Sequence, residues 1–426
     1  MSKKKNNKGL VPKLRFPEFR NSGEWKLVPL TNALLSITNG LSIEQINNSA
    51  GYKVTRIETI SNHFINLDKV GFIITNQNLS QYKLNIGDIL FSNINSLEHI
   101  GKCAFVDKDY DLYHGMNLLR LVTNEKDNIA KYIYYLLKTS IVNRSIKSRS
   151  NKAVNQASIN QTELGRTSIL LPTKQEQQKI ADCLTSLDNL ITAETQKLDA
   201  LKSHKKGLMQ NLFPADGETV PKLRFPEFRD SGEWEINKLG DVTKSVSKKN
   251  SEGLKLPIYS INNVVGFMPQ NEQFEGIDSN DRGYDISLYK IIDKHTFAYN
   301  PARINVGSIG YSGELHDIII SSLYVCFKTK NEINDKFLQI FLKTSIFMKS
   351  VNNKVEGGIR SYLFYENFSN IQILIPPTIK EQQKIVDCLT SLDDMISSQS
   401  HRIETLKAHK KGLMQQLFPS VDEVDE

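Results

Sequence analysis

Residues 173–213 read TKQEQQKIADCLTSLDNLITAETQKLDALKSHKKGLMQNLF, and residues 378–418 repeat this stretch as TIKEQQKIVDCLTSLDDMISSQSHRIETLKAHKKGLMQQLF. An ungapped alignment of residues 175–214 with residues 380–419 leaves 25 of 40 positions identical. A repeat of this length predicts two structurally equivalent segments, one in each half of the chain.

Each copy opens with the signature of a helix start. Thr173 is followed three positions later by Glu176, and Thr378 by Glu381. In such a capping box the Thr hydroxyl and the Glu carboxylate accept hydrogen bonds from backbone amides that a helix start leaves free. We therefore expect both helices to begin at equivalent positions.

Apolar residues in both copies alternate at spacings of four and three, which is the heptad seam of a coiled coil. Polar residues interrupt the seam at equivalent positions, Glu194 and Gln399 and then Lys205 and Lys410, as is common where a coiled coil fixes its register. One such helix alone would expose its leucines, so we expect the two copies to pack antiparallel on each other as a rod of roughly 55 Å. A core helix of a single globular domain is the alternative. The seam consists of Ile180, Leu184, Leu187, Ile191, Leu198, Leu201, Leu208 and Leu212, and of Ile385, Leu389, Leu392, Ile396, Ile403, Leu406, Leu413 and Leu417.

Length and composition indicate a multidomain globular protein. The 426 residues exceed one typical core, and 39% hydrophobic with 24% charged residues is usual for a soluble chain. The net charge of +7 permits an anionic partner such as nucleic acid without requiring one. The basic N-terminus precedes no apolar run, and no stretch approaches the ~18 apolar residues of a membrane span, so we expect a cytoplasmic protein.

Cysteine usage indicates a reducing compartment. Cys103, Cys183, Cys326 and Cys388 form no CxxC pair, and no His lies at metal-ligand spacing from them. We expect no disulfides and no bound metal.

A second repeated segment, called here the head segment, precedes each variable block. Residues 11–25 read VPKLRFPEFRNSGEW, and residues 220–234 read VPKLRFPEFRDSGEW. Proline and aromatic residues at this density indicate an extended segment docked on a domain, with Trp25 and Trp234 as its anchors.

The blocks between head segment and long helix differ in sequence but share a pattern. Apolar runs such as GDILFSNI and HTFAYN predict strands. An apolar-periodic helix is predicted near residues 128–145 and near residues 334–349, and both contain the motif Leu-Lys-Thr-Ser-Ile, at 137–141 and 342–346.

The predicted fold class is α/β (α+β): two similar globular domains separated by two long antiparallel coiled-coil helices, with a pseudo-twofold internal repeat. The predicted boundaries are a disordered basic tail at 1–10, a first domain at 11–172, a central long helix at 173–213, a linker at 214–219, a second domain at 220–377, a distal long helix at 378–418 and an acidic tail at 419–426.

The EQQKI helix start, the KKGLMQ-LF helix end, the VPKLRFPEFR head segment and the duplicated layout together resemble the specificity (S) subunit of type I restriction–modification enzymes. The resemblance covers essentially the whole chain. It implies two target-recognition domains, each reading one half of a bipartite double-stranded DNA site, with the helices setting the gap. It also implies assembly with two adenine-N6 methyltransferase (M) subunits and with restriction (R) subunits, in DNA methylation and defence against foreign DNA.

The sequence predicts that this chain is not itself an enzyme. Asn300-Pro-Ala-Arg303 lacks the second Pro and the aromatic residue of the loop with which adenine methyltransferases hold the target amine. No Gly-rich loop follows a strand, and no phosphate-binding G-x-x-x-x-G-K-[ST] motif occurs. The resemblance implies that S-adenosylmethionine, ATP and Mg²⁺ are used by the partner subunits and that this chain binds no cofactor.

Side chains near predicted turns are candidates for DNA contacts, since Arg and Lys match guanine, Asn and Gln match adenine, and Ser and Thr serve base or phosphate. The alternative for each residue is a satisfied turn or a solvated surface. In the first block the candidates are Asn93, Asn95, His99, Lys102, His114, Asn117, Asn155 and Gln156, with a basic run suited to phosphates at Arg144, Lys147, Arg149 and Lys152. In the second block they are Asn300, Arg303, Asn305, Ser308, Arg360, Ser361 and Tyr362. Lys205, Lys206, Lys410 and Lys411 are expected to complement the helix dipole or to contact a partner.

Two other functions remain open on sequence alone. One is a coiled-coil scaffold whose two domains bind proteins, and the other is a self-sufficient enzyme. A DNA-specificity subunit should bind duplex with steep salt dependence, whereas a protein scaffold should not.

Overall fold

The computed structural model describes residues 10–46, 50–61, 63–153, 156–274, 276–354 and 362–419. The chain divides into two compact units. The first unit contains Met1–Thr195 and His401–Glu426, and the second contains Gln196–Ser400. Each unit therefore combines one variable block, the first part of the long helix that follows it and one terminal part of the other long helix.

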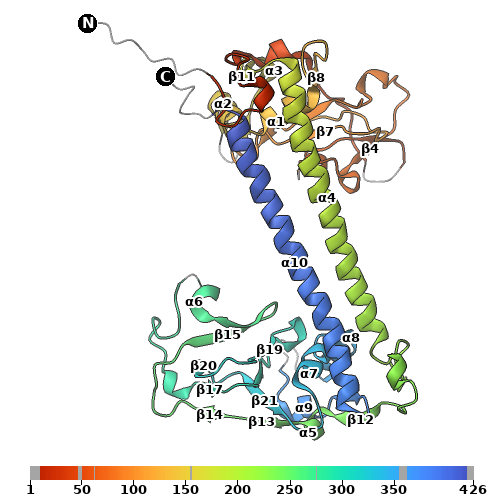
Figure 1. Cartoon of the computed structure of the whole chain (residues 1–426), viewed down its shortest axis with the longest axis vertical. Helices are drawn as coiled ribbons and strands as arrows, with labels where there is room; N and C mark the ends of the chain where they lie inside the picture. Colours follow the sequence, from red (N-terminus) through yellow and green to blue (C-terminus); the bar gives the residue numbers. More distant parts are fainter. Residues whose placement is uncertain are drawn as a thin grey trace. The chain divides into compact units, whose positions relative to one another are not determined.

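The two repeated stretches form the long helices α4 (Lys174–Asn211) and α10 (Ile379–Leu417), drawn yellow-green and blue in Figure 1. Every seam position is buried or half-buried. Ion pairs join the two helices within each unit, and the residue numbers rise on one helix as they fall on the other, so the helices are antiparallel there. These pairs are Asp188–Lys410 and Glu194–Arg402 in the first unit and Lys205–Asp393 in the second.

Each block is built on a four-stranded antiparallel sheet with the same strand order. The order is β2-β8-β5-β7 in the first unit and β13-β21-β18-β19 in the second. The bounds are β2 (Leu34–Asn39), β5 (Ile89–Phe91), β7 (Cys103–Phe105), β8 (Leu119–Thr123), β13 (Thr243–Ser245), β18 (Phe297–Tyr299), β19 (Ile309–Tyr311) and β21 (Val325–Thr329).

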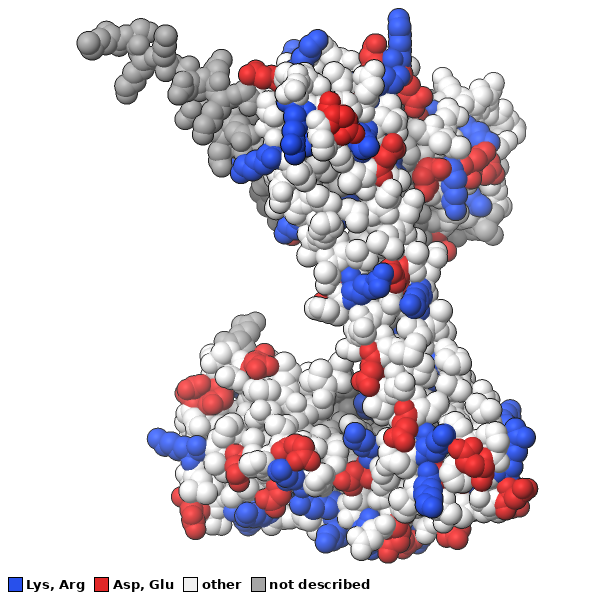
Figure 2. Space-filling view, in the orientation of Figure 1, with Lys and Arg blue, Asp and Glu red and all other residues white. Residues whose placement is uncertain are grey.

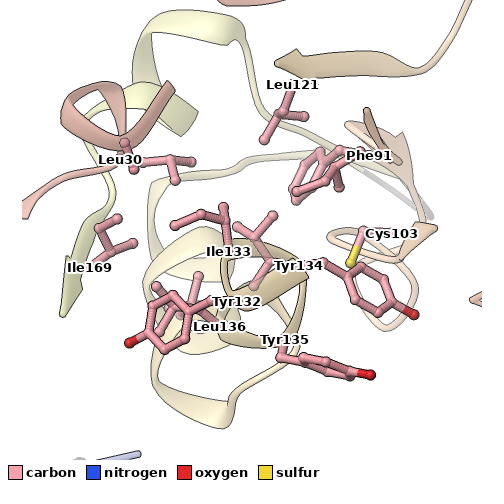
Figure 3. Close-up of a cluster of buried hydrophobic side chains, with 14 of the residues drawn as sticks. Leu30, Phe91, Cys103, Leu121, Tyr132, Ile133, Tyr134, Tyr135, Leu136 and Ile169 are labelled. Carbon is pink, nitrogen blue, oxygen red and sulfur yellow. The ribbon is translucent and has the colours of Figure 1, made fainter. Parts of the chain in front are cut away.

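A helix pair packs on each sheet. Figure 3 shows Ile133 of the first helix, with its neighbours on that helix, gathered with Leu30, Phe91 and Leu121 in one buried cluster. The helices are α1 (Ala130–Leu137) and α2 (Ser140–Arg149) in the first unit, and α7 (Asp335–Phe341) and α8 (Ser345–Lys354) in the second.

The single helix predicted in each block was wrong, because the Leu-Lys-Thr-Ser-Ile motif divides it into two. Thr139 Oγ1 donates to the carbonyl of Leu136 at 2.7 Å and accepts from the amide of Val142, so this residue ends α1 and caps α2. Thr344 makes the equivalent contacts between α7 and α8. A Thr that satisfies a free carbonyl and a free amide allows the chain to turn between two short helices.

The end of each long helix contributes to the core of the unit in which it ends. In the first unit Phe418 packs edge-on against Trp25, with ring centroids 6.2 Å apart, and in the second Phe213 packs against Trp234 at 5.9 Å. Both tryptophans are 2% exposed, which confirms their predicted role as anchors.

The remaining elements differ between the units. The first unit has the sheets β3-β4 and β6-β10-β9, whereas the second has a five-stranded sheet of order β14-β17-β20-β15-β16. In both units the strand after the head segment pairs antiparallel with the strand before the long helix, β1 with β11 and β12 with β22. The strand bounds are β1 (Lys26–Pro29), β3 (Tyr52–Val54), β4 (Gly71–Ile73), β6 (Ile94–Asn95), β9 (Asn151–Ala153), β10 (Gln156–Ser158), β11 (Ser168–Leu171), β12 (Glu235–Lys238), β14 (Lys248–Lys249), β15 (Ile258–Asn262), β16 (Gly266–Pro269), β17 (Lys290–Ile292), β20 (Ile318–Ile320) and β22 (Gln372–Ile375). The short helices are α3 (Gln161–Gly165), α5 (Leu239–Val242), α6 (Gln270–Gln273) and α9 (Tyr365–Ser369), with 3₁₀ turns η1 (Pro17–Phe19), η2 (Leu30–Ala33), η3 (Ile57–Ile60), η4 (Leu67–Lys69), η5 (Ser80–Tyr82), η6 (Pro226–Phe228), η7 (Ile286–Leu288) and η8 (Ile304–Val306).

Candidate nucleic-acid interface

The Glu of the EQQKI motif fastens the head segment to the long helix. Glu176 is buried and accepts two hydrogen bonds from Arg15, both at 2.7 Å, and a longer one from the indole of Trp25. The Arg15 guanidinium also donates to the carbonyl of Gly23. Thr173 Oγ1 accepts from the Glu176 amide as the capping box predicts, but the Glu176 carboxylate binds Arg15 and Trp25 instead of closing the box.

The second unit repeats this arrangement residue by residue. Glu381 accepts two hydrogen bonds from Arg224, both at 2.8 Å, and one from Trp234. The first Gln of the motif ties the helix to the start of the helix pair: Gln177 accepts from the Ile129 amide, and Gln382 from the Asn334 amide. The motif thus holds each block on its long helix.

In both units the segment that follows one inner strand of the four-stranded sheet, β5 or β18, is hydrogen-bonded to the segment that follows the second helix of the pair. In the first unit the Asn93 carbonyl, beyond β5, accepts from the Ile159 amide at 2.9 Å. In the second unit the Pro301 carbonyl, beyond β18, accepts from the Leu363 amide at 3.0 Å. Segments that carry two separate sets of candidate residues are therefore neighbours in each unit, at an equivalent place on an equivalent scaffold.

In the first unit this meeting point is the small sheet β6-β10-β9. Asn95 pairs with Ala157, and Ala157 also pairs with Lys152 on the neighbouring strand. Asn95 and Lys152 therefore lie on either side of Ala157, on the same face of the small sheet. Gln156 is exposed on the same strand as Ala157. Asn155 lies outside the described residues.

The other candidates of the first unit are spread more widely. His99 is exposed in the turn after β6, and Lys102 donates to the carbonyl of Ser61. Asn117 is exposed and adopts the left-handed conformation, with φ of 68°. The side-chain carbonyl oxygen of Asn93 is buried and has no hydrogen-bond partner among the described residues, whereas its Nδ2 donates to the Ile159 carbonyl at 3.4 Å.

The basic run follows α2 into β9. Arg144 and Lys152 are exposed and Lys147 is half-buried, whereas Arg149 lies 3.5 Å from Glu163.

Two candidates are interior residues, and their burial assigns them a structural role instead of a DNA contact. His114 is 1% exposed, its Nε2 lies 3.0 Å from the Leu118 carbonyl, and burial lowers its pKa to about 4. This imidazole is therefore neutral at pH 7. Ser308 is 4% exposed and donates to the Ile261 carbonyl.

In the second unit the turn η8 presents Arg303 and Asn305 to solvent. Gly307, with φ of 88°, ends this turn. Asn300 Oδ1 accepts from the Ala302 amide at 3.0 Å and so shapes the turn, which is the structural alternative that the sequence left open for such residues.

Tyr362 lies beside this turn, since the next residue, Leu363, bonds to Pro301. Its ring is stacked on Phe364 with an interplanar angle of 5°, and it is 37% exposed. Arg360 and Ser361 lie outside the described residues.

The sequence did not single out the tip of the β15–β16 hairpin. Val264 and Val265 are 80% and 66% exposed there, and the Asn262 side chain accepts from both of their amides. Both valines and Asn305 line one hollow of about 530 Å³. Two adjacent apolar residues at a turn are unusual, and this feature of the sequence could have indicated the surface. Exposed methyl groups of this kind suit contact with the methyl group of thymine.

Basic and acidic side chains are mixed on the surface that Figure 2 shows. On the face shown in Figure 2, Lys and Arg side chains are interspersed with Asp and Glu over both units. No helix among the described residues is long and apolar enough to cross a membrane. Within the described ranges, no cluster of three His, Cys, Asp or Glu side chains could hold a metal ion.

Comparison with known proteins gives matches along nearly the whole chain. A family model described as the Type I restriction modification DNA specificity domain matches residues 23–203 and again residues 231–408. Over 410 residues the chain is 31% identical to a Methanocaldococcus jannaschii protein named as the type I restriction enzyme MjaX specificity subunit, and the match covers 93% of each chain. A second protein of that organism, the type I restriction enzyme MjaIX specificity subunit, is 25% identical over 308 residues, which is 68% of each chain.

Two solved structures share the fold. The type I restriction–modification S subunit from M. genitalium aligns with a TM-score of 0.58 and 18% identity, over 97% of this chain and 100% of that chain. A chain from a structural study of complex assembly and conformational transition of the type I R-M system aligns with a TM-score of 0.56 and 14% identity, over 93% and 98% of the two chains.

Proposed function

Since the chain belongs to the type I restriction-modification DNA specificity family, with two DNA-recognition domains, we propose that each domain reads one half of a bipartite DNA site. The two long helices would then set the gap between the half-sites. The chain is a specificity subunit, and its two units would divide the target between them.

One observation carries this proposal. The Asn93–Ile159 and Pro301–Leu363 hydrogen bonds bring the same two segments together in both domains. The scaffold beneath them is shared, yet the side chains they present differ: Asn95, Lys152 and Gln156 in one domain, and Arg303, Asn305 and Tyr362 in the other. Equivalent surfaces with different hydrogen-bonding groups suit two different base sequences.

We further propose that this chain directs methylation without catalysing it. Asn300, which together with Pro301 matches the start of the methyltransferase loop, uses its side-chain oxygen to shape its own turn. The chemistry, with S-adenosylmethionine, ATP and Mg²⁺, would belong to two adenine-N6 methyltransferase subunits and to restriction subunits, assembled with this chain in the cytoplasm.

The test is sequencing of methylated adenines in a host that carries the methyltransferase gene with and without this chain. A bipartite motif that appears only when this chain is present supports the proposal, as does the absence of methyl transfer by the purified chain. Methylation by the chain alone would refute the division of labour. Binding of duplex without salt dependence would favour the protein scaffold instead.

A further inference from the structure

The tip of the β15–β16 hairpin is apolar, exposed and held by its own hydrogen bonds. Asn262 pairs with Gly266 in the hairpin, so residues 263–265 form its turn. Gly266 has φ of 79°, the left-handed conformation with which a glycine closes a three-residue hairpin turn. The Asn262 side chain accepts from the amide of Val264 at 2.8 Å and from that of Val265 at 3.3 Å. The backbone of the turn is therefore fixed while both valine side chains face solvent.

The hairpin is fastened to the turn η8, which carries candidate DNA contacts. Ser308 Oγ donates to the Ile261 carbonyl at 2.9 Å and so joins the end of the turn to β15. A Cβ added to Gly310 of β19 would lie 3.0 Å from the Gly266 Cα, and the two glycines thus let β16 and β19 approach closely. This packing explains why the two valines of the tip and Asn305 of the turn line one hollow.

The hairpin lies in the part of the second unit that differs from the first. Its strands β15 and β16 belong to the five-stranded sheet, and the described residues of the first unit form no such sheet. A partner that binds both units alike requires a surface that recurs in both. An element found in one unit suits instead the base sequence that only this unit reads.

The chemistry of the tip matches one group of the DNA bases. In the major groove, thymine presents a C5-methyl group, whereas the edges of the other bases present hydrogen-bonding groups. Valine side chains have no donor or acceptor, so they can distinguish bases there only by contact with that methyl group. The neighbouring Asn305 carries an exposed amide, which matches the donor and acceptor of adenine. A turn that is already ordered loses little conformational entropy when it binds.

We propose that Val264 and Val265 contact the C5-methyl group of one thymine in the half-site that the second domain reads, beside the base that η8 contacts. The inference rests on the proposed function, and it adds the chemical group by which this domain recognises one of its bases.

Deoxyuridine tests the proposal, because it removes the methyl group of thymine and leaves every hydrogen-bonding group in place. The full chain, assembled with the methyltransferase subunit, is titrated with duplexes of its bipartite site in which each thymine in turn is replaced by deoxyuridine. One replacement should weaken binding about fourfold, the effect of taking one methyl group out of an apolar contact. The Val264→Ala, Val265→Ala double variant should bind the thymine and uracil forms of this duplex with nearly equal affinity.

Two further variants serve as comparisons. Ile236→Ala alters an exposed apolar residue of β12, in a different sheet of the same unit, and should retain the fourfold preference for thymine. Asn305→Ala should weaken binding of both duplexes by the same factor and retain the preference. Because both valines are exposed, the double variant should keep the melting temperature of the unaltered chain.

Failure of this inference differs from failure of the proposed function. If no bipartite motif is methylated when the chain is present, the proposed function fails, and this inference fails with it. If the motif is bipartite but no uracil replacement weakens binding, only the methyl contact is overturned. It is also overturned if the double variant retains the preference for thymine or loses affinity for both duplexes equally. Loss of the bound methyltransferase subunit from the double variant would overturn it as well, because the valines would then contact a protein.

Discussion

Lys410 Nζ lies 2.5 Å from Asp188 Oδ1, and this ion pair joins the end of α10 to α4 within the first unit. Lys410 also lies 5.1 Å from the centre of the Tyr135 ring. In the second unit Lys205 pairs with Asp393, and these residues are the counterparts of Lys410 and Asp188 in the repeat. The lysines that interrupt the apolar seam therefore pair across it and specify which positions of the two helices face each other.

The first prediction concerns this pair. Lys410→Met should lower the free energy of unfolding of the first unit by about 1 kcal/mol, because the pair is only partly shielded from water. A double-mutant cycle with Asp188→Asn, measured by denaturant unfolding, gives the coupling energy. Lys407→Met, on an exposed position of the same helix, is the control. Strict additivity of the two substitutions would show that the pair contributes nothing.

The second prediction concerns the buried ion pair beneath the head segment. Arg15→Ala leaves the carboxylate of Glu176 buried without its guanidinium and should cost about 3–5 kcal/mol of unfolding free energy. Arg15→Met combined with Glu176→Leu should cost much less, because no buried charge remains. Arg20→Ala, at an exposed position of the same segment, should change stability by less than about 0.5 kcal/mol. A small effect of Arg15→Ala would mean that the head segment is not held by this pair.

The third prediction concerns base reading in the second domain. If Arg303 makes a bidentate contact with guanine, Arg303→Ala should cost about 1–3 kcal/mol at one base position of one half-site. Competition binding with a set of single-base variants of the site measures this. A uniform loss over all sequences would identify a phosphate contact, and Arg229→Ala in the head segment should leave every affinity unchanged.

The fourth prediction concerns the helices as a ruler. Deleting residues 195–201 together with residues 400–406 removes one heptad from each long helix and shortens a helix by ~10 Å. The deletions lie between the Asp188–Lys410 and Lys205–Asp393 pairs, so both pairs can still form. Sequencing of methylated sites should then show unchanged half-sites at a shorter gap. An unchanged gap would refute the ruler.

The fifth prediction uses the way each long helix ends. A chain that stops after Pro214 lacks Phe418, which packs against Trp25 in the first unit, but it retains Phe213 at the equivalent place of an equivalent helix. A second copy can supply that Phe and cover the apolar seam, so light scattering should show a twofold homodimer.

With the methyltransferase present, this homodimer should methylate an interrupted palindrome of the first half-site. Phe213→Ala in the shortened chain should weaken dimerisation, whereas it should leave the fold of the first unit in the full chain intact. A folded, soluble monomer would contradict the packing. A dimer with an asymmetric target would contradict the assignment of one half-site to each domain.

The long helices could be predicted from sequence because their determinants are local. The four-three spacing from Ile180 onward and the Thr173 cap were sufficient to place α4 and α10 to within about two residues. The sequence predicted one helix where the structure has the pair α1 and α2, because the apolar periodicity continues across Thr139. Only its two hydrogen bonds, to Leu136 and Val142, reveal the break.

Which of the candidate residues are buried could be determined only from the structure. His114 and Ser308 stand in turn-like sequence as Asn117 and Asn305 do, and composition does not distinguish a side chain that points inward from one that faces solvent. The bond between Asn93 and Ile159 joins segments far apart in the chain, and it determines which candidates act on one surface.

The sequence by itself determined that the chain has two equivalent helices, two head segments with Trp anchors and two unlike blocks, because repeats and heptad spacing are visible in the order of residues. Only the tertiary structure decided which helix end joins which core. Both long helices lead into the same Leu-Phe-Pro sequence, which contains Phe213 in one and Phe418 in the other. The local sequence would therefore let either Phe pack against Trp25 or against Trp234. The structure pairs Phe418 with Trp25 and Phe213 with Trp234. The first of these contacts joins residues at opposite ends of the chain, which local sequence does not specify.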